Sequence, residues 1–273
     1  MSDTTARPTP RWRPITYGVL MVLLLFLYLG DRPQQLAFLV TAFGDLSPDQ
    51  GATHEIHFLA QGVLAWVIVA AIAVQVRRPT TRIGALWVHT LGLLLAFTLL
   101  LVLADLPAEV VPILAGAIVL AALGFFAHPA SLRDKLRTVA PPSSVLLVLT
   151  GIAGVAWVVY AFGQFDIHAA SGPHDEHHQF GHWVVMGAYG LLVPLFAAVA
   201  GLKVTGWRFP LWVAGLMSVA LGAGSLAISA VSQLSTAWAL LAIVWGAGFI
   251  GVGELEARQA APAREPSASP ASR

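Results

Sequence analysis

Long apolar segments with almost no charges recur along the chain, and they constrain its fold more than any other feature. Spanning a bilayer takes about 20 predominantly apolar residues. Eight segments qualify, namely residues 15–29, 55–76, 83–104, 109–127, 144–165, 173–202, 210–230 and 235–253. Only 11% of the 273 residues are charged, whereas soluble domains carry roughly 25%. The sequence therefore predicts an all-α integral membrane protein with eight transmembrane helices.

Basic and acidic loops alternate between the predicted spans. Arg and Lys collect at residues 7–13, 77–82, 133–137 and 203–208, and Asp residues occupy the loops between them, with Arg32 as the basic exception. Loops rich in Arg and Lys stay on the cytoplasmic side of a membrane. We therefore expect a multi-pass protein of the cell (inner) membrane with both termini cytoplasmic. Residues 1–14 would form a cytoplasmic segment, and residues 254–273, rich in Ala, Pro and Ser, a disordered cytoplasmic tail.

Short sequence matches indicate an internal duplication. Residues 84–92 (GALWVHTLG) align with residues 209–217 (FPLWVAGLM), and Glu55-Ile56-His57 aligns with Glu176-His177-His178. We interpret the chain as two four-helix membrane repeats, at residues 15–127 and 144–253, joined by a cytoplasmic linker at residues 128–143. An even number of spans in each repeat makes the two repeats parallel.

The composition and the motifs exclude several function classes. The chain contains no cysteine, which excludes disulfides, thiolate zinc sites and iron–sulfur clusters. Its net charge of +1 gives no sign of nucleic-acid binding. The sequence has no Walker A, GxSxG or HExxH motif, and the GxGxxG match at residues 246–251 lies inside an apolar span, where glycines indicate helix packing. Neither an ATPase nor a hydrolase is indicated.

Histidines concentrate at the entries of two predicted spans. Residues 172–183 (GPHDEHHQFGHW) and residues 53–62 (THEIHFLAQG) together hold six of the nine histidines. If residues 173–183 form a helix, His174, His178 and His182 share one of its faces. His54, His57 and Gln61 would likewise share one face of the earlier helix. The duplication would bring the two faces together on the extracytoplasmic side.

Imidazoles one helical turn apart can chelate one metal ion. Copper or zinc is therefore the expected ion, with the candidate ligands His54, His57, His174, His177, His178 and His182. Ligands or acceptors that fix the histidine tautomers would be Glu55, Gln61, Asp175 and Glu176. A structural polar cluster and a pH-responsive role, which the titration range of histidine allows, are the alternatives.

A haem b between two facing helices is a second cofactor hypothesis, with His57 and His178 as its axial pair. The eight-span duplicated plan with outward histidines resembles haem A synthase in architecture. That resemblance implies a further histidine on the fourth and eighth spans. Here His128 lies at the cytoplasmic end of the fourth span and the eighth has none, so we assign no family.

Two histidines fall near the predicted cytoplasmic side. His89 lies within the third span, where we expect a neutral ring bonded to Thr90 or to a neighbouring carbonyl. His128 follows the fourth span, and we expect it to extend to the membrane interface.

The preferred function is binding of copper, zinc or a haem at the extracytoplasmic face, for metal handling or electron transfer. The alternative is a proton- or pH-linked transporter, or an assembly or structural partner in a membrane complex, without a bound cofactor. The lipid bilayer is the expected partner. A membrane-protein partner or a homo-oligomer stays open.

Overall fold

The computed structural model describes residues 10, 12–30, 51–228 and 233–260, and these are largely helical. Six helices are long and apolar enough to cross a membrane: α3 (Gly51–Arg77), α4 (Ile83–Leu103), α7 (Ser144–Ala170), α9 (His182–Gly201), α10 (Arg208–Ala227) and α11 (Thr236–Gln259). Two shorter apolar helices are α1 (Trp12–Gly30) and α5 (Val111–Ala127). The connections hold η1 (Pro79–Thr81), α6 (Leu132–Leu136) and α8 (Glu176–Gln179). The predicted all-helical fold is confirmed, and its long apolar helices are compatible with a membrane protein. The eight-span count and the four-helix repeats stay predictions.

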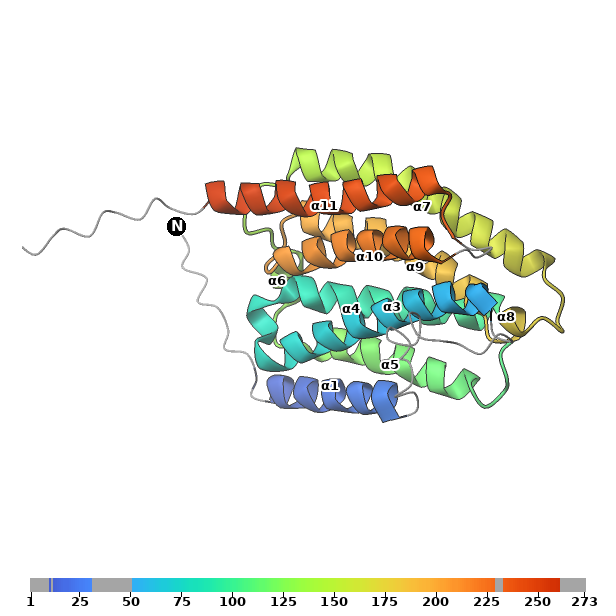
Figure 1. The fold of residues 1–273 in the computed structure, drawn as a ribbon. Helices are drawn as coiled ribbons and strands as arrows, with labels where there is room; N and C mark the ends of the chain where they lie inside the picture. The colour runs from blue at the N-terminus through green and yellow to red at the C-terminus, as the bar shows by residue number, and fades with distance from the viewer. Residues whose placement is uncertain (1–9, 11, 31–50, 229–232, 261–273) are drawn as a thin grey trace, which may run out of the picture.

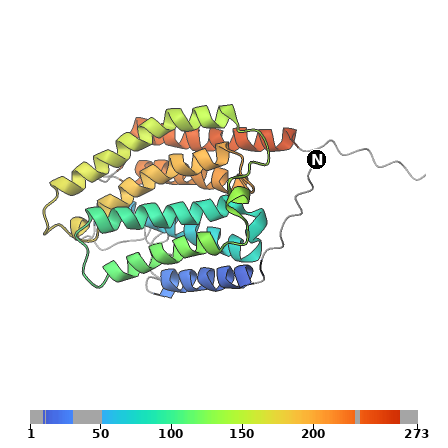
Figure 2. The same ribbon diagram turned by 180° about the vertical axis from the view of Figure 1, so that it is seen from behind.

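Four helices form the centre of the bundle. Helices α3, α4, α9 and α10 all contact one another. Helices α1 and α5 pack together on one side of this centre, and α7 and α11 lie on the other, as both views show (Figure 1, Figure 2). The centre thus joins α3 and α4 from the first half of the chain to α9 and α10 from the second.

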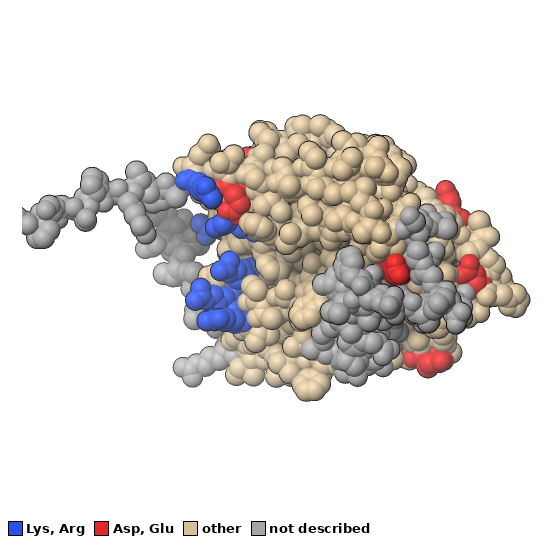
Figure 3. All heavy atoms as spheres, in the orientation of Figure 1, with Lys and Arg blue, Asp and Glu red and all other residues tan. Residues whose placement is uncertain are grey.

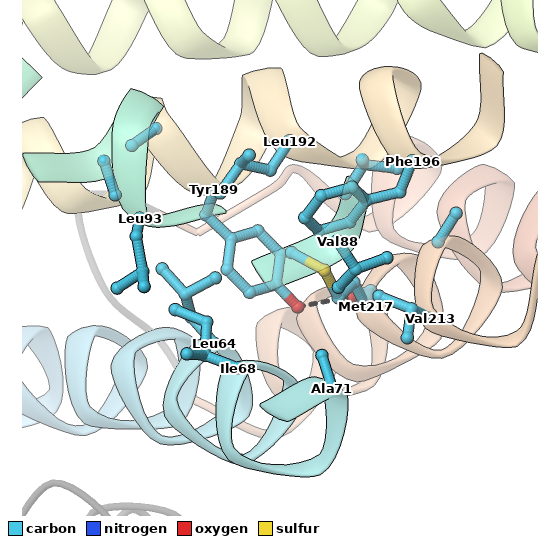
Figure 4. Packing of buried hydrophobic residues seen from close by; sticks show 14 of the residues in the cluster. Leu64, Ile68, Ala71, Val88, Leu93, Tyr189, Leu192, Phe196, Val213 and Met217 are labelled. Carbon is cyan, nitrogen blue, oxygen red and sulfur yellow. Dashed lines mark hydrogen bonds between the residues drawn. The ribbon is translucent and has the colours of Figure 1, made fainter. Parts of the chain in front are cut away.

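Apolar side chains fill the space between the central helices (Figure 4). Phe196 and Tyr189 of α9 are fully buried beside Leu64 and Ile68 of α3. The Tyr189 hydroxyl donates a hydrogen bond of 2.7 Å to the Met217 carbonyl of α10. A buried hydroxyl without such a partner would cost about 1–3 kcal/mol, so this bond lets a tyrosine occupy the core.

The outer helices expose large apolar side chains instead of covering them. Val155 of α7 and Val244 of α11 are 68% and 69% exposed. Over the most apolar 18-residue stretch of each helix, only 17% of α7 and 28% of α11 is buried, against 72% of α9. Contiguous apolar surface of this extent is the face that a membrane protein presents to lipid.

Glycines allow α10 and α11 to approach closely. A Cβ atom on Gly215 would lie 2.7 Å from the Gly246 carbonyl oxygen, and one on Gly246 would lie 2.5 Å from that of Gly215. Both distances are too short for a side chain. The helix-packing role expected for the glycines at residues 246–251 is therefore confirmed at Gly246.

The charged residues divide between the two ends of the bundle. Figure 3 shows Lys and Arg side chains gathered at one end and Asp and Glu side chains mostly at the other. The basic end carries the loops at residues 77–82, 133–137 and 203–208, and the acidic end carries Asp105, Asp166 and Asp175. This separation matches the alternating loops in the sequence.

The last helix runs further than the sequence predicts. We expected a disordered tail from Glu254, but α11 continues to Gln259. Glu256 forms an ion pair of 2.7 Å with Lys203, and Glu254 accepts a 2.9 Å hydrogen bond from Arg208 Nε. These pairs hold the final turns of α11 against the basic end. Residues 261–273 of the predicted tail lie outside the described residues.

A buried polar group, the basic-end hub (Tyr17, Gln75 and His128), joins three helices. Gln75 Oε1 accepts hydrogen bonds from the Tyr17 hydroxyl at 3.0 Å and from His128 Nε2 at 3.3 Å. The backbone N–H of Ala130 donates to His128 Nδ1 at 3.0 Å. The expectation that His128 extends to the membrane interface is therefore wrong, because its ring is 0% exposed. His89 does bond a neighbouring carbonyl, that of Ala85, as expected.

Candidate metal centre

The histidine-rich stretch is broken into two helical pieces, which corrects the expected continuous helix over residues 173–183. Helix α8 ends at Gln179, and α9 begins at His182 after Gly181, whose φ is +62°. Asp175 begins α8 by accepting a 2.7 Å hydrogen bond from the His177 backbone N–H. Aspartate forms such local turns in competition with a continuing helix. The single face predicted for His174, His178 and His182 therefore does not form.

Gly181 is required at this break. A positive φ favours glycine, and a Cβ atom there would lie 2.7 Å from Leu100 Cδ2 and 2.9 Å from Ala104 Cβ. The backbone therefore turns sharply against the end of α4. The turn changes which histidines face α3.

Three imidazoles from three helices converge at the acidic end. His54 of α3, His177 of α8 and His182 of α9 each offer a ring nitrogen, and these nitrogens all lie within 4.8 Å of one another. We call this group the three-histidine cluster. The His57 ring lies beside it, with its centroid 5.2 Å from those of His177 and His182. The two histidine-rich entries thus meet, as the sequence predicts.

Asp175 fixes the orientation of one member of the cluster. His177 Nδ1 lies 3.0 Å from Asp175 Oδ1, which places the proton on Nδ1 and leaves the Nε2 lone pair for another partner. Partial burial opposes charge on Asp175, but hydrogen bonds from the His177 backbone and ring outweigh it, so the pKa of Asp175 lies below its usual range. A carboxylate bonded to the far side of an imidazole is a common partner of metal-binding histidines.

Two nitrogens of the cluster have no hydrogen-bond partner. His177 Nε2 and His182 Nδ1 are buried and make no hydrogen bond within the described part of the chain. Most buried polar atoms in proteins do have a partner. Because both nitrogens belong to rings of the three-histidine cluster, a ligand bound within the cluster could supply the partner of each.

His178 points away from the cluster, although it follows His177 directly. Its ring stacks on that of His168 with centroids 4.2 Å apart. Nδ1 lies 3.0 Å from the His168 carbonyl oxygen, and Nε2 lies 3.1 Å from Asp105 Oδ2. The hydrogen bond to the Asp105 side chain raises the pKa of His178. The contacts of His178 fasten α8 to α7 and to the loop after α4.

The other predicted site residues lie outside these contacts. His174 is exposed, and Glu55 and Gln61 are half-buried on α3. The side chain of Glu176 lies outside the described part of the structure. Sequence reasoning missed Asp105 and His168, which approach His178 from separate segments, and it also missed Trp183. Trp183 is only 4% exposed, and its ring lies edge-on to that of His57 at 4.8 Å. The local sequence around these residues carries no signal for such long-range contacts.

Comparisons of the chain with protein-family models, curated proteins and solved structures found no match.

Proposed function

We propose that this multi-pass membrane protein binds a divalent transition metal ion, zinc or copper, through His54, His177 and His182. The role that we propose for the ion is metal handling at the extracytoplasmic face. The observation that supports this proposal is the convergence of three imidazole nitrogens within 4.8 Å of one another. Imidazole is a preferred ligand of both ions, and the lack of cysteine disfavours sites that need thiolates.

The geometry is close to what a metal requires. Nitrogens that bind one zinc ion at 2.0–2.1 Å in tetrahedral geometry lie roughly 3.4 Å apart. Small rotations of the three rings would close the remaining gap. The ligands come from α3, α8 and α9, so the site depends on the assembled fold, and bound metal should stabilise that fold. Asp175 would keep His177 in the tautomer that presents Nε2.

The separation of charge supports the proposed orientation. Because Arg- and Lys-rich ends face the cytoplasm, the basic end would lie inside and the three-histidine cluster at the outer face. Both termini would then be cytoplasmic, in the cell (inner) membrane.

The haem hypothesis has less support. Both ring nitrogens of His178 already face acceptors, the His168 carbonyl and the Asp105 carboxylate. His178 would have to leave both, and its stack on His168, before it could serve as an axial ligand with His57.

Metal analysis of the purified protein tests this proposal. After treatment with a chelator, the detergent-solubilised protein is titrated with ZnCl₂ and with CuCl₂, and bound metal is measured by equilibrium dialysis. We expect one equivalent of one of the two metals. The variants His177→Ala and His182→Ala should each weaken binding at least 100-fold, because each removes one of three ligands (about 2.7 kcal/mol or more).

His174→Ala is the matched control, because His174 lies in the same stretch but is exposed. It should bind metal as the wild type does. If His182→Ala kept wild-type affinity, or His174→Ala lost as much as His182→Ala, the proposed site would be refuted. An intense Soret band in the purified protein would instead select haem. No bound cofactor of either kind would leave the transporter and structural-partner alternatives.

A further inference from the structure

Trp183 carries a buried hydrogen-bond donor that the fold does not use. Its side chain follows His182 at the start of α9 and is only 4% exposed. The indole Nε1 is buried and has no hydrogen-bond partner in the part of the chain that the structure describes. Leaving a buried N–H without an acceptor costs about 1–3 kcal/mol. Such a donor calls for an explanation.

The ring that holds this donor lines the metal site. The Trp183 ring lies edge-on to His57, with centroids 4.8 Å apart and planes at 86°. It also lies 5.4 Å from the ring of His177. An indole whose N–H is unused thus lies beside His57 and beside one member of the cluster, His177.

The cluster supplies only three of the ligands that a metal takes. Zinc in proteins is usually four-coordinate, and sites with three protein ligands hold water or substrate in the fourth position. Among the described His, Asp and Glu residues, the group within 4.8 Å is His54, His177 and His182. Asp175, a carboxylate that contacts the cluster, already bonds the far side of His177. The fourth position therefore needs either His57 or a ligand from solution.

We propose that the fourth position takes a small hydrogen-bond-accepting ligand to which Trp183 Nε1–H donates. This inference rests on the proposed metal site. The ligand is water or hydroxide at rest and is replaceable by a small monoanion. Three neutral imidazoles leave the full charge of a divalent ion uncompensated, which favours an anion as the fourth ligand. The replacement is a ligand exchange, in which water leaves the metal and no electron moves.

Azide is the probe for this position, because its bond to Cu²⁺ gives a charge-transfer absorption band. The protein is loaded with one equivalent of Cu²⁺ and titrated with sodium azide. We expect a saturable band in the wild type. Trp183→Phe should hold the same equivalent of Cu²⁺ but bind azide about tenfold more weakly, since it removes one hydrogen bond to a charged acceptor.

Trp157→Phe is the matched control. Trp157 is a buried tryptophan of α7, 5% exposed, whose ring packs against Tyr160 and not against the cluster. It should bind azide as the wild type does. Trp183→Leu, whose side chain has no hydrogen-bond donor, serves if the phenylalanine variant does not fold. The wild-type titration needs no variant.

The outcomes separate this inference from the metal site itself. Wild-type protein that holds copper but gives no azide band would overturn the inference and leave the metal site intact. Unchanged azide affinity in Trp183→Phe would also overturn it. If His57→Ala lowers copper affinity as much as His182→Ala, the fourth position belongs to His57. Failure to hold any metal would instead refute the proposed function.

Discussion

Two buried polar groups lie near opposite ends of helix α3, and they differ in whether their buried polar atoms have hydrogen-bond partners. At the basic end, Gln75 Oε1 accepts from both Tyr17 and His128, and Gln75 Nε2 donates to the Arg82 carbonyl. At the acidic end, about 32 Å along the same helix, buried nitrogens of His177 and His182 face one another's rings without a partner.

The difference separates a structural polar group from a binding site. A buried network whose members are all bonded fixes the packing of the helices that supply them. Buried polar atoms without hydrogen-bond partners cost stability. Where several of them converge, as at the three-histidine cluster, the arrangement is typical of a site that binds a ligand. The burial of a histidine would not by itself distinguish the two groups, since His128 of the hub is as buried as His57 beside the cluster.

The largest effect on folding is expected from Gln75→Leu. This change removes the acceptor that the Tyr17 hydroxyl and His128 Nε2 share inside the buried hub. We expect a loss of about 3 kcal/mol in the free energy of unfolding, measured by denaturant unfolding in detergent. Zinc or copper affinity of the folded fraction should not change.

Gln61→Leu is the control for that substitution. Gln61 lies on the same helix and is half-buried, but it is not part of the hub. It should cost far less stability than Gln75→Leu. A small loss for Gln75→Leu, or a weakened metal site in that variant, would mean that the two ends of α3 do not differ as described.

The apolar segments and loop charges predict much of the fold because they act locally. A run of about 20 apolar residues can satisfy its backbone in lipid only as a helix, so α3, α4, α7, α10 and α11 begin within four residues of their predicted starts. The meeting of the two histidine-rich entries could also be predicted, from the short matches around His57 and His178.

The detailed site could not be predicted, because it depends on one backbone turn and on distant partners. Helical spacing placed His178 with His182, but the break at Gly181 puts His177 there instead. Which of two adjacent histidines faces the cluster is decided by Asp175 on one side and by Asp105 and His168 on the other. The contacts with Asp105 and His168 join segments that the local sequence does not relate.

A smaller effect is expected where a carboxylate supports the cluster from outside. Asp175→Ala removes the acceptor that holds His177 in its ligand tautomer, so we expect metal affinity to fall about tenfold, the lower end of the usual effect of such partners. Isothermal titration with the metal that the protein retains measures this. Asp166→Ala, an exposed aspartate at the same end, should leave affinity unchanged. Equal affinities for Asp175→Ala and Asp166→Ala would show that the carboxylate has no part in the site.

The smallest effect concerns pH and belongs to the basic-end hub. Burial is the main cause that lowers the pKa of His128 to about 4, and charge repulsion by Lys135 and His89 adds to it. In an unfolded chain the pKa would be about 6.5. Its Nδ1 also accepts from the Ala130 N–H, which protonation would prevent. The unfolded state therefore binds the proton more readily, and the contribution of His128 is fully present above pH 6.5 and is lost as the pH falls. Between pH 6.5 and pH 5.5 the loss is about 1 kcal/mol.

Unfolding curves of the metal-free wild type and of His128→Phe at both pH values isolate the contribution of His128, since the other histidines titrate in both proteins. We expect the wild type to lose about 1 kcal/mol more in its free energy of unfolding than the variant. Equal losses would contradict the structure, because they would mean that the His128 imidazole is solvated and not held neutral by burial and hydrogen bonds.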